Sequence, residues 1–387
     1  MAASSVNFSD RLQFQKPQIN LARSTAGRMW LVNLCAFLAI IQSSSSDSFS
    51  SLTVAAGALT GALIVEFLFL FRGGKARMLR DGSAVASALI LTLFLPNTIS
   101  PLYAMAGAAF AMAIIKHSSG GLGSNWLNPA AGGWLFIRLS WPSAFNRALE
   151  ASPLSILSES LSRGVTNAQG SPLGILKVDA AGFFASPSAL DGILRSFLNK
   201  TIFALSGAEL PEGYMDLFAS RFPGIIADRG VLALLIGTII ITASEVNRSW
   251  IPVLYLAVYS FLVRVFGALP FGGGYWNGDV IFALCSGGTL AAAFFLASDP
   301  ATEAKSNRGI FLITLSGGAL SFLFRFVGAD PYGAVLAALF INALTPLVKV
   351  LERRQLYEKQ NKTQAPGQGS RVSLVGIIFN VSPRKYS

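Results

Sequence analysis

Two short segments gather polar side chains beside glycine and proline in a chain that is otherwise strongly apolar. The first, "GGLGSNWLNPA", contains Asn125 and Asn128, and the second, "ASDPAT", contains Asp299 and Thr302. Amide groups donate and accept hydrogen bonds, and a carboxylate can cap free backbone amides or meet a cation. The two segments are therefore candidates for a polar site that serves ion passage or a bound ligand. A plain turn explains the first equally well, and for Asp299 the capping and site roles both stay open.

Four ionisable residues fall within apolar runs or at their ends: Glu66, Arg138, Arg264 and Arg325. A charge inside a membrane is expensive, so each is a functional candidate by default. We expect Glu66 and Arg138 to lie deepest. We expect Arg264 and Arg325, which lie near the ends of their runs, to extend their charged groups toward water.

Metal-binding residues are scarce. His117 is the single histidine, and we interpret it as a loop residue; Cys35 and Cys285 are the two cysteines, far apart and inside apolar runs. Without closely spaced thiols or imidazoles, the sequence predicts no zinc site or iron–sulfur cluster built by this chain alone.

The residues that must position these groups are those of an integral membrane protein. Of 387 residues, 52% are hydrophobic and 13% are charged, with a mean hydropathy of +0.55. A hydrocarbon core about 30 Å thick needs roughly 20 apolar residues in a helix. The sequence predicts an all-α protein with about ten such helices, over residues 29–47, 52–71, 83–101, 102–116, 128–141, 231–247, 250–266, 279–297, 309–326 and 332–350.

The net charge of +11 reflects membrane topology rather than nucleic-acid binding, because among the short connections lysine and arginine occur only in alternate ones. The loops "SSSSDSFSS", "LPNTISP", "GALPFGGGYWNG" and "VGADPYG" contain neither residue. The positive-inside rule then predicts that both termini are cytoplasmic and that the long segment after the fifth helix is outside. The first residues are polar, so no cleavable signal peptide is expected. The expected parts are a tail 1–28, helices 29–141, an outer segment 142–229, helices 230–350 and a tail 351–387.

A similar phrase recurs in the two groups of helices. In the first group "LFLPNTISP" precedes "GGLGSNWLNPAAGG", and in the second "AAAFFLASDPATEA" precedes "VGADPYGAVLAALFINALTP". An odd number of spans separates the copies, so the sequence predicts two inverted repeats of five helices. In such folds interrupted helices meet near the midplane to form the site.

The ordered set "GGLGSNWLNPA", "FFLASDPAT", "NRG" and "GADPYGAVLAALFINALTPLV" resembles the D subunit of the Rnf complex, the ion-translocating ferredoxin:NAD oxidoreductase. It is more distantly similar to the B subunit of the sodium-pumping NADH:quinone reductase. The resemblance covers nearly the whole chain. It implies a membrane subunit of a redox pump in the bacterial cytoplasmic (inner) membrane, assembled with other membrane and peripheral subunits. Electrons would pass through flavins and drive sodium ions or protons outward.

The family also attaches FMN through a phosphodiester to a threonine in the outer segment. The corresponding stretch here reads "ASPSALD", in which Ser188 stands at the threonine's place and Ser186 is a near rival, while Pro187 departs from the family's pattern. The resemblance thus implies covalent FMN at Ser188 and, in addition, a bound riboflavin. Two other classes stay open on the residues alone: a passive small-solute channel of the same architecture, and a scaffold protein of the complex without flavin.

Overall fold

The structure is a computed structural model. It describes residues 25–45, 49–73, 81–121, 123–145, 189–201, 204, 215, 218, 225–244, 246, 248–271, 274–304, 306–328, 330 and 332–364. Within these ranges the protein is helical, and the only β-type pairing is an isolated bridge between Pro96 and Ile225.

The first half of the chain forms a group of apolar helices, α1 Thr25–Ser44, α2 Ser50–Gly73, α3 Ser83–Leu93, α4 Pro101–Phe110 with η3 Ala111–His117, and α5 Pro129–Ser140. Proline stands at the first position of α4 and α5, where its missing N–H costs nothing. Helices α2 and α4 pack closely because Gly57 and Gly61 present no side chain to the α4 backbone. A Cβ on Gly61 would lie 2.1 Å from the Met105 carbonyl oxygen.

The second half forms another group, α11 Ile226–Arg229, α12 Val231–Ala243, α13 Trp250–Phe266 with η5 Leu269–Phe271, α14 Val280–Cys285, α15 Thr289–Ala291 with η6 Ala292–Leu296, α16 Asn307–Phe322 with η7 Leu323–Val327, and α17 Gly333–Gln364. The prediction of one continuous helix over 279–297 is wrong. Gly287 and Gly288 adopt φ of 64° and 62°, a left-handed conformation that glycine alone reaches without strain, and they divide α14 from α15.

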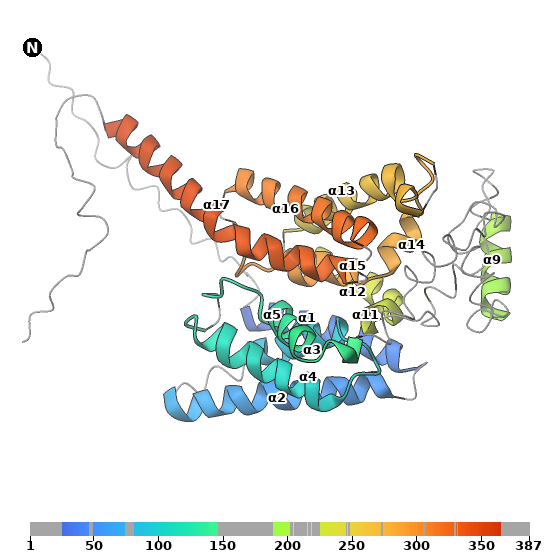
Figure 1. Ribbon diagram of the computed structural model, residues 1–387, viewed down its shortest axis with the longest axis horizontal. Coiled ribbons are helices and arrows are strands. Elements are labelled where there is room, and N and C mark those ends of the chain that lie inside the picture. Colours follow the sequence, from blue (N-terminus) through green and yellow to red (C-terminus); the bar gives the residue numbers. More distant parts are fainter. Residues whose placement is uncertain are drawn as a thin grey trace, which may run out of the picture.

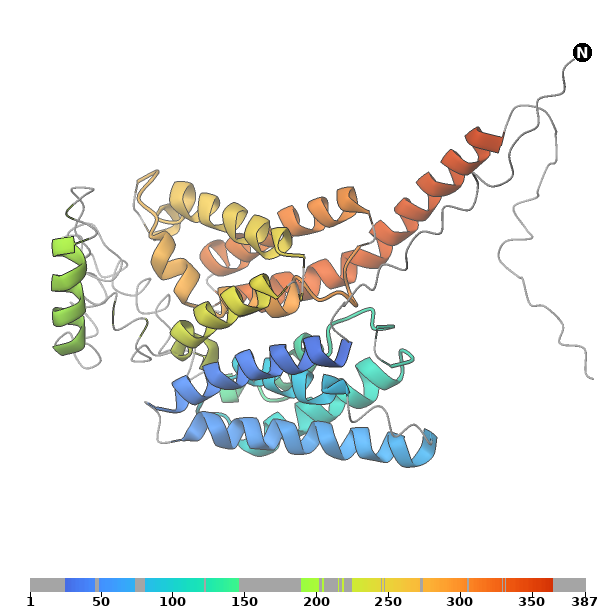
Figure 2. The ribbon, with the colours of Figure 1, turned by 180° about the vertical axis from the view of Figure 1, so that it is seen from behind.

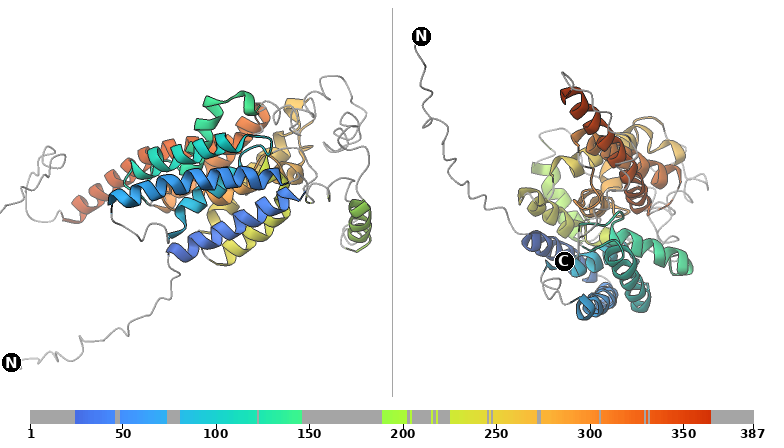
Figure 3. Two further views of the ribbon diagram at one scale, coloured as in Figure 1. Left: turned by 90° about the horizontal axis from the view of Figure 1, so that it is seen from below. Right: turned by 90° about the vertical axis from the view of Figure 1, so that its left-hand side faces the viewer.

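The two groups lie side by side with their long axes roughly aligned (Figures 1 and 2). An end-on view shows the first group, in blue and green, below the second, in yellow to red (Figure 3, right). Helix α9 Ala189–Thr201 lies beyond one end of the bundle, and α17 extends past the opposite end (Figure 1). We call these the α9 end and the α17 end.

Four stretches of helix in the described part of the chain are long and apolar enough to cross a membrane: Thr25–Ser44, Ser50–Phe69, Asn307–Val327 and Gly333–Arg354. Helices α3, α12 and α13 are shorter and also apolar. Many large apolar side chains remain exposed on these helices, as lipid contact requires. The expectation of an all-helical, multi-pass membrane protein is confirmed.

Candidate functional site

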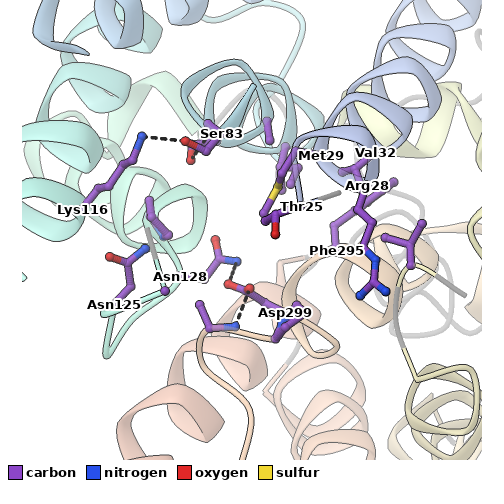
Figure 4. Close-up of a pocket in the computed structure, with 18 of the residues that line it drawn as sticks. Thr25, Arg28, Met29, Val32, Ser83, Lys116, Asn125, Asn128, Phe295 and Asp299 are labelled. Atoms are coloured by element: carbon purple, nitrogen blue, oxygen red, sulfur yellow. Dashed lines mark hydrogen bonds between the residues drawn. The ribbon is translucent and has the colours of Figure 1, made fainter. Parts of the chain in front are cut away.

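A cavity of about 330 Å³ lies near the α17 end of the bundle, where several helix ends converge (Figure 4). Its walls come from the start of α1, the start of α3, the end of η3, the segment before α5, and η6 with the residues after it. The lining residues used below are Ser83, Lys116, Asn125, Asn128 and Asp299, together with the apolar Met29, Val32, Ala86 and Phe295. Cavities of this size suit small organic ligands.

Asn128 and Asp299 join the two halves of the chain at this cavity. Asn128 is the N-cap of α5, and its Oδ1 accepts from the N–H groups of Ala130 and Ala131 at 2.9 and 3.4 Å. Its Nδ2 donates to Asp299 Oδ2 at 2.9 Å, while Asp299 Oδ1 accepts from the Ala301 N–H at 3.0 Å. Asp299 therefore caps its own turn and bridges to the other half. The two segments approach one another as expected, but beside helix ends and not near the middle of the bundle.

Asp299 lies in the connection between η6 and α16, outside both helices. Burial raises the pKa of its carboxyl above the ordinary value, and the hydrogen bonds from the Ala301 N–H and Asn128 oppose that rise.

Asn125 and Thr302 differ in their relation to the cavity. Asn125 is buried and lines it, and its Oδ1 has no hydrogen-bond partner among the described residues. Thr302 instead lines a small neighbouring cavity beside Ile251, and its hydroxyl donates to the Asp299 carbonyl oxygen at 3.4 Å. Thr302 therefore supports the Asp299 turn and does not line the main cavity.

A buried charged cluster forms one wall of the cavity. Lys116 Nζ donates to Glu66 Oε1 at 3.0 Å, Glu66 Oε2 at 3.1 Å and Ser83 Oγ at 2.7 Å (Figure 4 shows the last of these). His117 Nε2 lies 2.8 Å from Glu66 Oε2, and its ring stacks on Phe69. Both basic residues lie at the end of η3, which is a π-helix. The prediction of a deep Glu66 is confirmed, whereas His117 belongs to a helix end and not to a loop.

Two of the three arginines depart from expectation. Arg325 does not reach water: it is 1% exposed and lies in the interior, where its guanidinium hydrogen-bonds to the broken helix α14–α15. Arg264 is exposed and donates to the Gly278 carbonyl oxygen at 3.2 Å. Arg138, expected to lie deepest with Glu66, is only partly buried. Its Nη2 lies 3.4 Å from Asp330 Oδ2, and its guanidinium carbon lies 5.1 Å from the ring centroid of Tyr332.

The family described as NQR2, RnfD, RnfE has a model that matches residues 13–358. The chain belongs to this family.

The chain is also similar to D subunits of ion-translocating oxidoreductase complexes. The D subunit of the ion-translocating oxidoreductase complex of Vibrio cholerae is 30% identical over 351 residues, 88% of this chain and 97% of that protein. The D subunit of the proton-translocating ferredoxin:NAD(+) oxidoreductase complex of Clostridium ljungdahlii is 29% identical over 332 residues, 86% and 91% of the two chains. The D subunit of the Na(+)-translocating ferredoxin:NAD(+) oxidoreductase complex of Acetobacterium woodii is 26% identical over 341 residues, 88% and 93%.

The flavin attachment that the NQR2, RnfD, RnfE family implied falls on residues that the structure does not describe. Ser188 and its rival Ser186 lie outside the described ranges, and α9 begins directly after Ser188 at Ala189. The described part of the chain holds no group of three or more potential metal ligands. Cys35 and Cys285 are buried and free.

Sequence reasoning about this family member missed Lys116. Lys116 stands at the end of an apolar run beside His117, and a lysine at that place is typical of a charge at the membrane surface. The carboxylate partner at Glu66, fifty positions earlier, was the available signal, since a buried carboxylate needs a cation.

Proposed function

We propose that this chain is the D-type membrane component of an Rnf-type complex, which couples electron transfer between ferredoxin and NAD to outward translocation of sodium ions or protons. The observation that carries the proposal is family membership over residues 13–358, with relatives named as D subunits that are matched over more than nine tenths of their length. The chain is an enzyme only as part of that complex, whose other membrane and peripheral subunits are its partners.

Two inverted repeats with ten membrane crossings in all are the proposed architecture. In both groups the fourth helix ends in a π-helical segment that carries a buried basic residue, Lys116 in η3 and Arg325 in η7. Each bonds to the second helix of its own group, Lys116 to Glu66 and Arg325 to Tyr259. Each also bonds at the third, to Ser83 and Ser286 respectively. A repeated arrangement of this kind supports duplication of one five-helix unit.

The proposed orientation has the α17 end in the cytoplasm and the α9 end outside. The described chain starts at Thr25, which lines the cavity near the α17 end, and α17 itself extends past that end. Both ends of the described chain thus lie on one side, in agreement with the distribution of lysine and arginine. The membrane would be the bacterial inner membrane.

The cavity beside Asn128 and Asp299 is the proposed place for a non-covalent flavin, with riboflavin as the candidate. The residues fit such a group, because apolar side chains, Met29, Val32 and Phe295, can cover a flat ring system. The unpartnered Oδ1 of Asn125 supplies a buried acceptor for an imide N–H. A bound flavin would supply one- and two-electron redox chemistry, and the chain's part would be to bind, orient and exclude water.

Covalent FMN at Ser188 is the second proposed flavin. Ser188 offers an aliphatic hydroxyl next to a small residue, Ala189, on the segment expected outside. Helix α9, which follows it directly, lies at the end of the bundle opposite the cavity. The two flavins would then serve opposite sides of the membrane.

Purification of the native complex through a tag on this chain tests the proposal. We expect other Rnf-type subunits to copurify, and the band of this chain on a denaturing gel to fluoresce under ultraviolet light. Ser188→Ala should darken the band, and Ser186→Ala should leave it bright. A chain that purifies alone, without flavin, would instead be a channel; a chain that copurifies with partners but carries no flavin would be a scaffold.

A further inference from the structure

The interruption between α14 and α15 gathers oxygen atoms inside the bundle. The last turn of α14 leaves the Ala283 carbonyl oxygen without an amide partner from its own helix, as helix ends do. Three hydroxyl oxygens point to the same place, those of Ser286 and Thr289 at the interruption and of Tyr259 on α13. All four residues are buried.

A carboxylate lies beside this set. Asp228 on α11 is buried, and its Oδ1 accepts from the Gly288 N–H at 2.7 Å, one position from Thr289. Carbonyl and hydroxyl oxygens at an unwound helix, with a carboxylate nearby, are the groups that coordinate alkali cations in membrane transporters. Protons also move along hydroxyl and carboxylate groups of this kind.

Arg325 of η7 fills the place that a cation would take. Its Nη1 donates to Tyr259 Oη at 2.6 Å, to Thr289 Oγ1 at 2.8 Å and to the Ala283 carbonyl oxygen, and its Nη2 donates to Ser286 Oγ. Among the described residues, no carboxylate oxygen lies within 4.0 Å of the guanidinium. The four oxygen atoms thus bond to a positive charge that belongs to the protein itself, the guanidinium of Arg325.

We propose that Arg325 is a tethered cation that closes the α14–α15 half of the bundle to sodium ions and protons. A mobile cation would have to displace a guanidinium that always keeps its charge and cannot leave. The approaching cation would also meet like-charge repulsion in a low-dielectric interior, the device by which an arginine excludes cations from water channels. The ions that the proposed complex moves therefore pass outside this half of the chain, through other subunits or along subunit interfaces.

The alternative is a purely structural arginine that ties α16 to the broken helix. The two roles separate when the positive charge is removed while folding is preserved. A structural arginine matters to assembly alone, whereas a tethered cation also determines passive ion flux.

Passive influx of radioactive sodium into proteoliposomes that hold the whole complex at rest, without electron donor, measures this directly. Arg325→Ala should raise the influx by about tenfold or more over wild type, since a local charge changes ion concentration by at least that factor. The Arg325→Lys complex, which keeps a positive charge, should show the same low sodium influx as wild type. Tyr259→Phe is the matched control, because it removes one oxygen and leaves the charge.

Three results would overturn the proposal: an assembled Arg325→Ala complex as tight as wild type, a Tyr259→Phe complex that leaks as much as Arg325→Ala, or Arg325→Lys leaking equally. If Arg325→Ala does not assemble, Arg325→Gln keeps amide donors without charge and is judged by the same criteria. The inference rests on the proposed function only for the ions' alternative route. Should the chain purify alone, the same flux measured on that chain tests Arg325 separately from the Rnf assignment.

Discussion

Asn128 Nδ2 donates a hydrogen bond to Asp299 Oδ2 at 2.9 Å, across 171 positions of sequence. The same asparagine caps α5 through its Oδ1. One side chain therefore fixes the start of a helix in the first half and holds the second half against it, at the edge of the cavity where we propose a flavin binds.

The two tasks of Asn128 separate by substitution. Asn128→Ser keeps a capping oxygen but is too short to bridge, so it should retain the stability of α5 and lose the contact to Asp299. Asn128→Ala should lose both and cost about 1 kcal/mol more, the usual value of an N-cap. The thermal midpoints of the purified complexes check this order; equal midpoints for the serine and alanine variants would contradict the capping role.

Glu66 is a fully buried carboxylate that pairs with Lys116. Glu66→Ala leaves Lys116 buried without its partner, and breaking a buried pair costs about 3–5 kcal/mol. The double variant Glu66→Ala/Lys116→Met removes both charges and should recover much of that lost stability. Asp330→Asn, which breaks the more exposed pair with Arg138, should cost at most about 1 kcal/mol.

Thermal midpoints and yields of assembled complex provide the comparison for these variants. A double variant that is less stable than Glu66→Ala alone would show that Lys116 is not destabilised by loss of its partner.

Close packing of α2 on α4 depends on Gly61. A Cβ there would lie 2.1 Å from the Met105 carbonyl oxygen, so Gly61→Ala should force the helices apart and destabilise the protein by about 1–3 kcal/mol. Gly192→Ala on α9 is the matched control, because among the described residues no atom beyond its own helix backbone and chain neighbours lies within 4 Å of the added Cβ. Thermal unfolding of the two variants should differ clearly; an unaffected Gly61→Ala would contradict the close approach.

The proposed sidedness is testable by chemical labelling. Both free cysteines are buried, so a single new thiol at Ala168→Cys should be the accessible one among these three positions. We expect a membrane-impermeant maleimide to label it from outside intact cells, because 142–229 is expected there. Reaction only in inverted vesicles would reverse the orientation. Cysteine placed at Ser316, which is partly exposed on α16, controls for labelling through lipid.

Much of the fold follows from hydrophobicity, since the apolar runs predicted where helices lie and how α1, α2, α13 and α16 begin and end to within a few residues. The break at Gly287 and Gly288 was missed, although "CSGGTL" contains the paired glycines that allow it. A run can stay apolar while its backbone departs from helix, because the freed polar groups find buried partners such as Asp228 and Arg325.

The site was predictable only in part for a related reason. Asn125, Asn128 and Asp299 stood out because polar residues beside breakers need partners in a membrane. Arg325 was expected to reach water, since its place near the end of a run does not tell which side of the helix it occupies. Arg325 lies in the π-helix η7 and points into the bundle. That direction depends on the arrangement of the neighbouring helices.

The non-covalent flavin content of the purified complex, counted per copy of this chain, tests the central claim most directly. Wild type and Ser188→Ala should release the same amount of riboflavin on denaturation. Ala86→Phe, which fills the cavity, and Asn125→Ala, which removes its free acceptor, should each release less, while Thr60→Val on the exposed surface of α2 should match wild type. Full riboflavin release from both assembled cavity variants would contradict a flavin in this cavity.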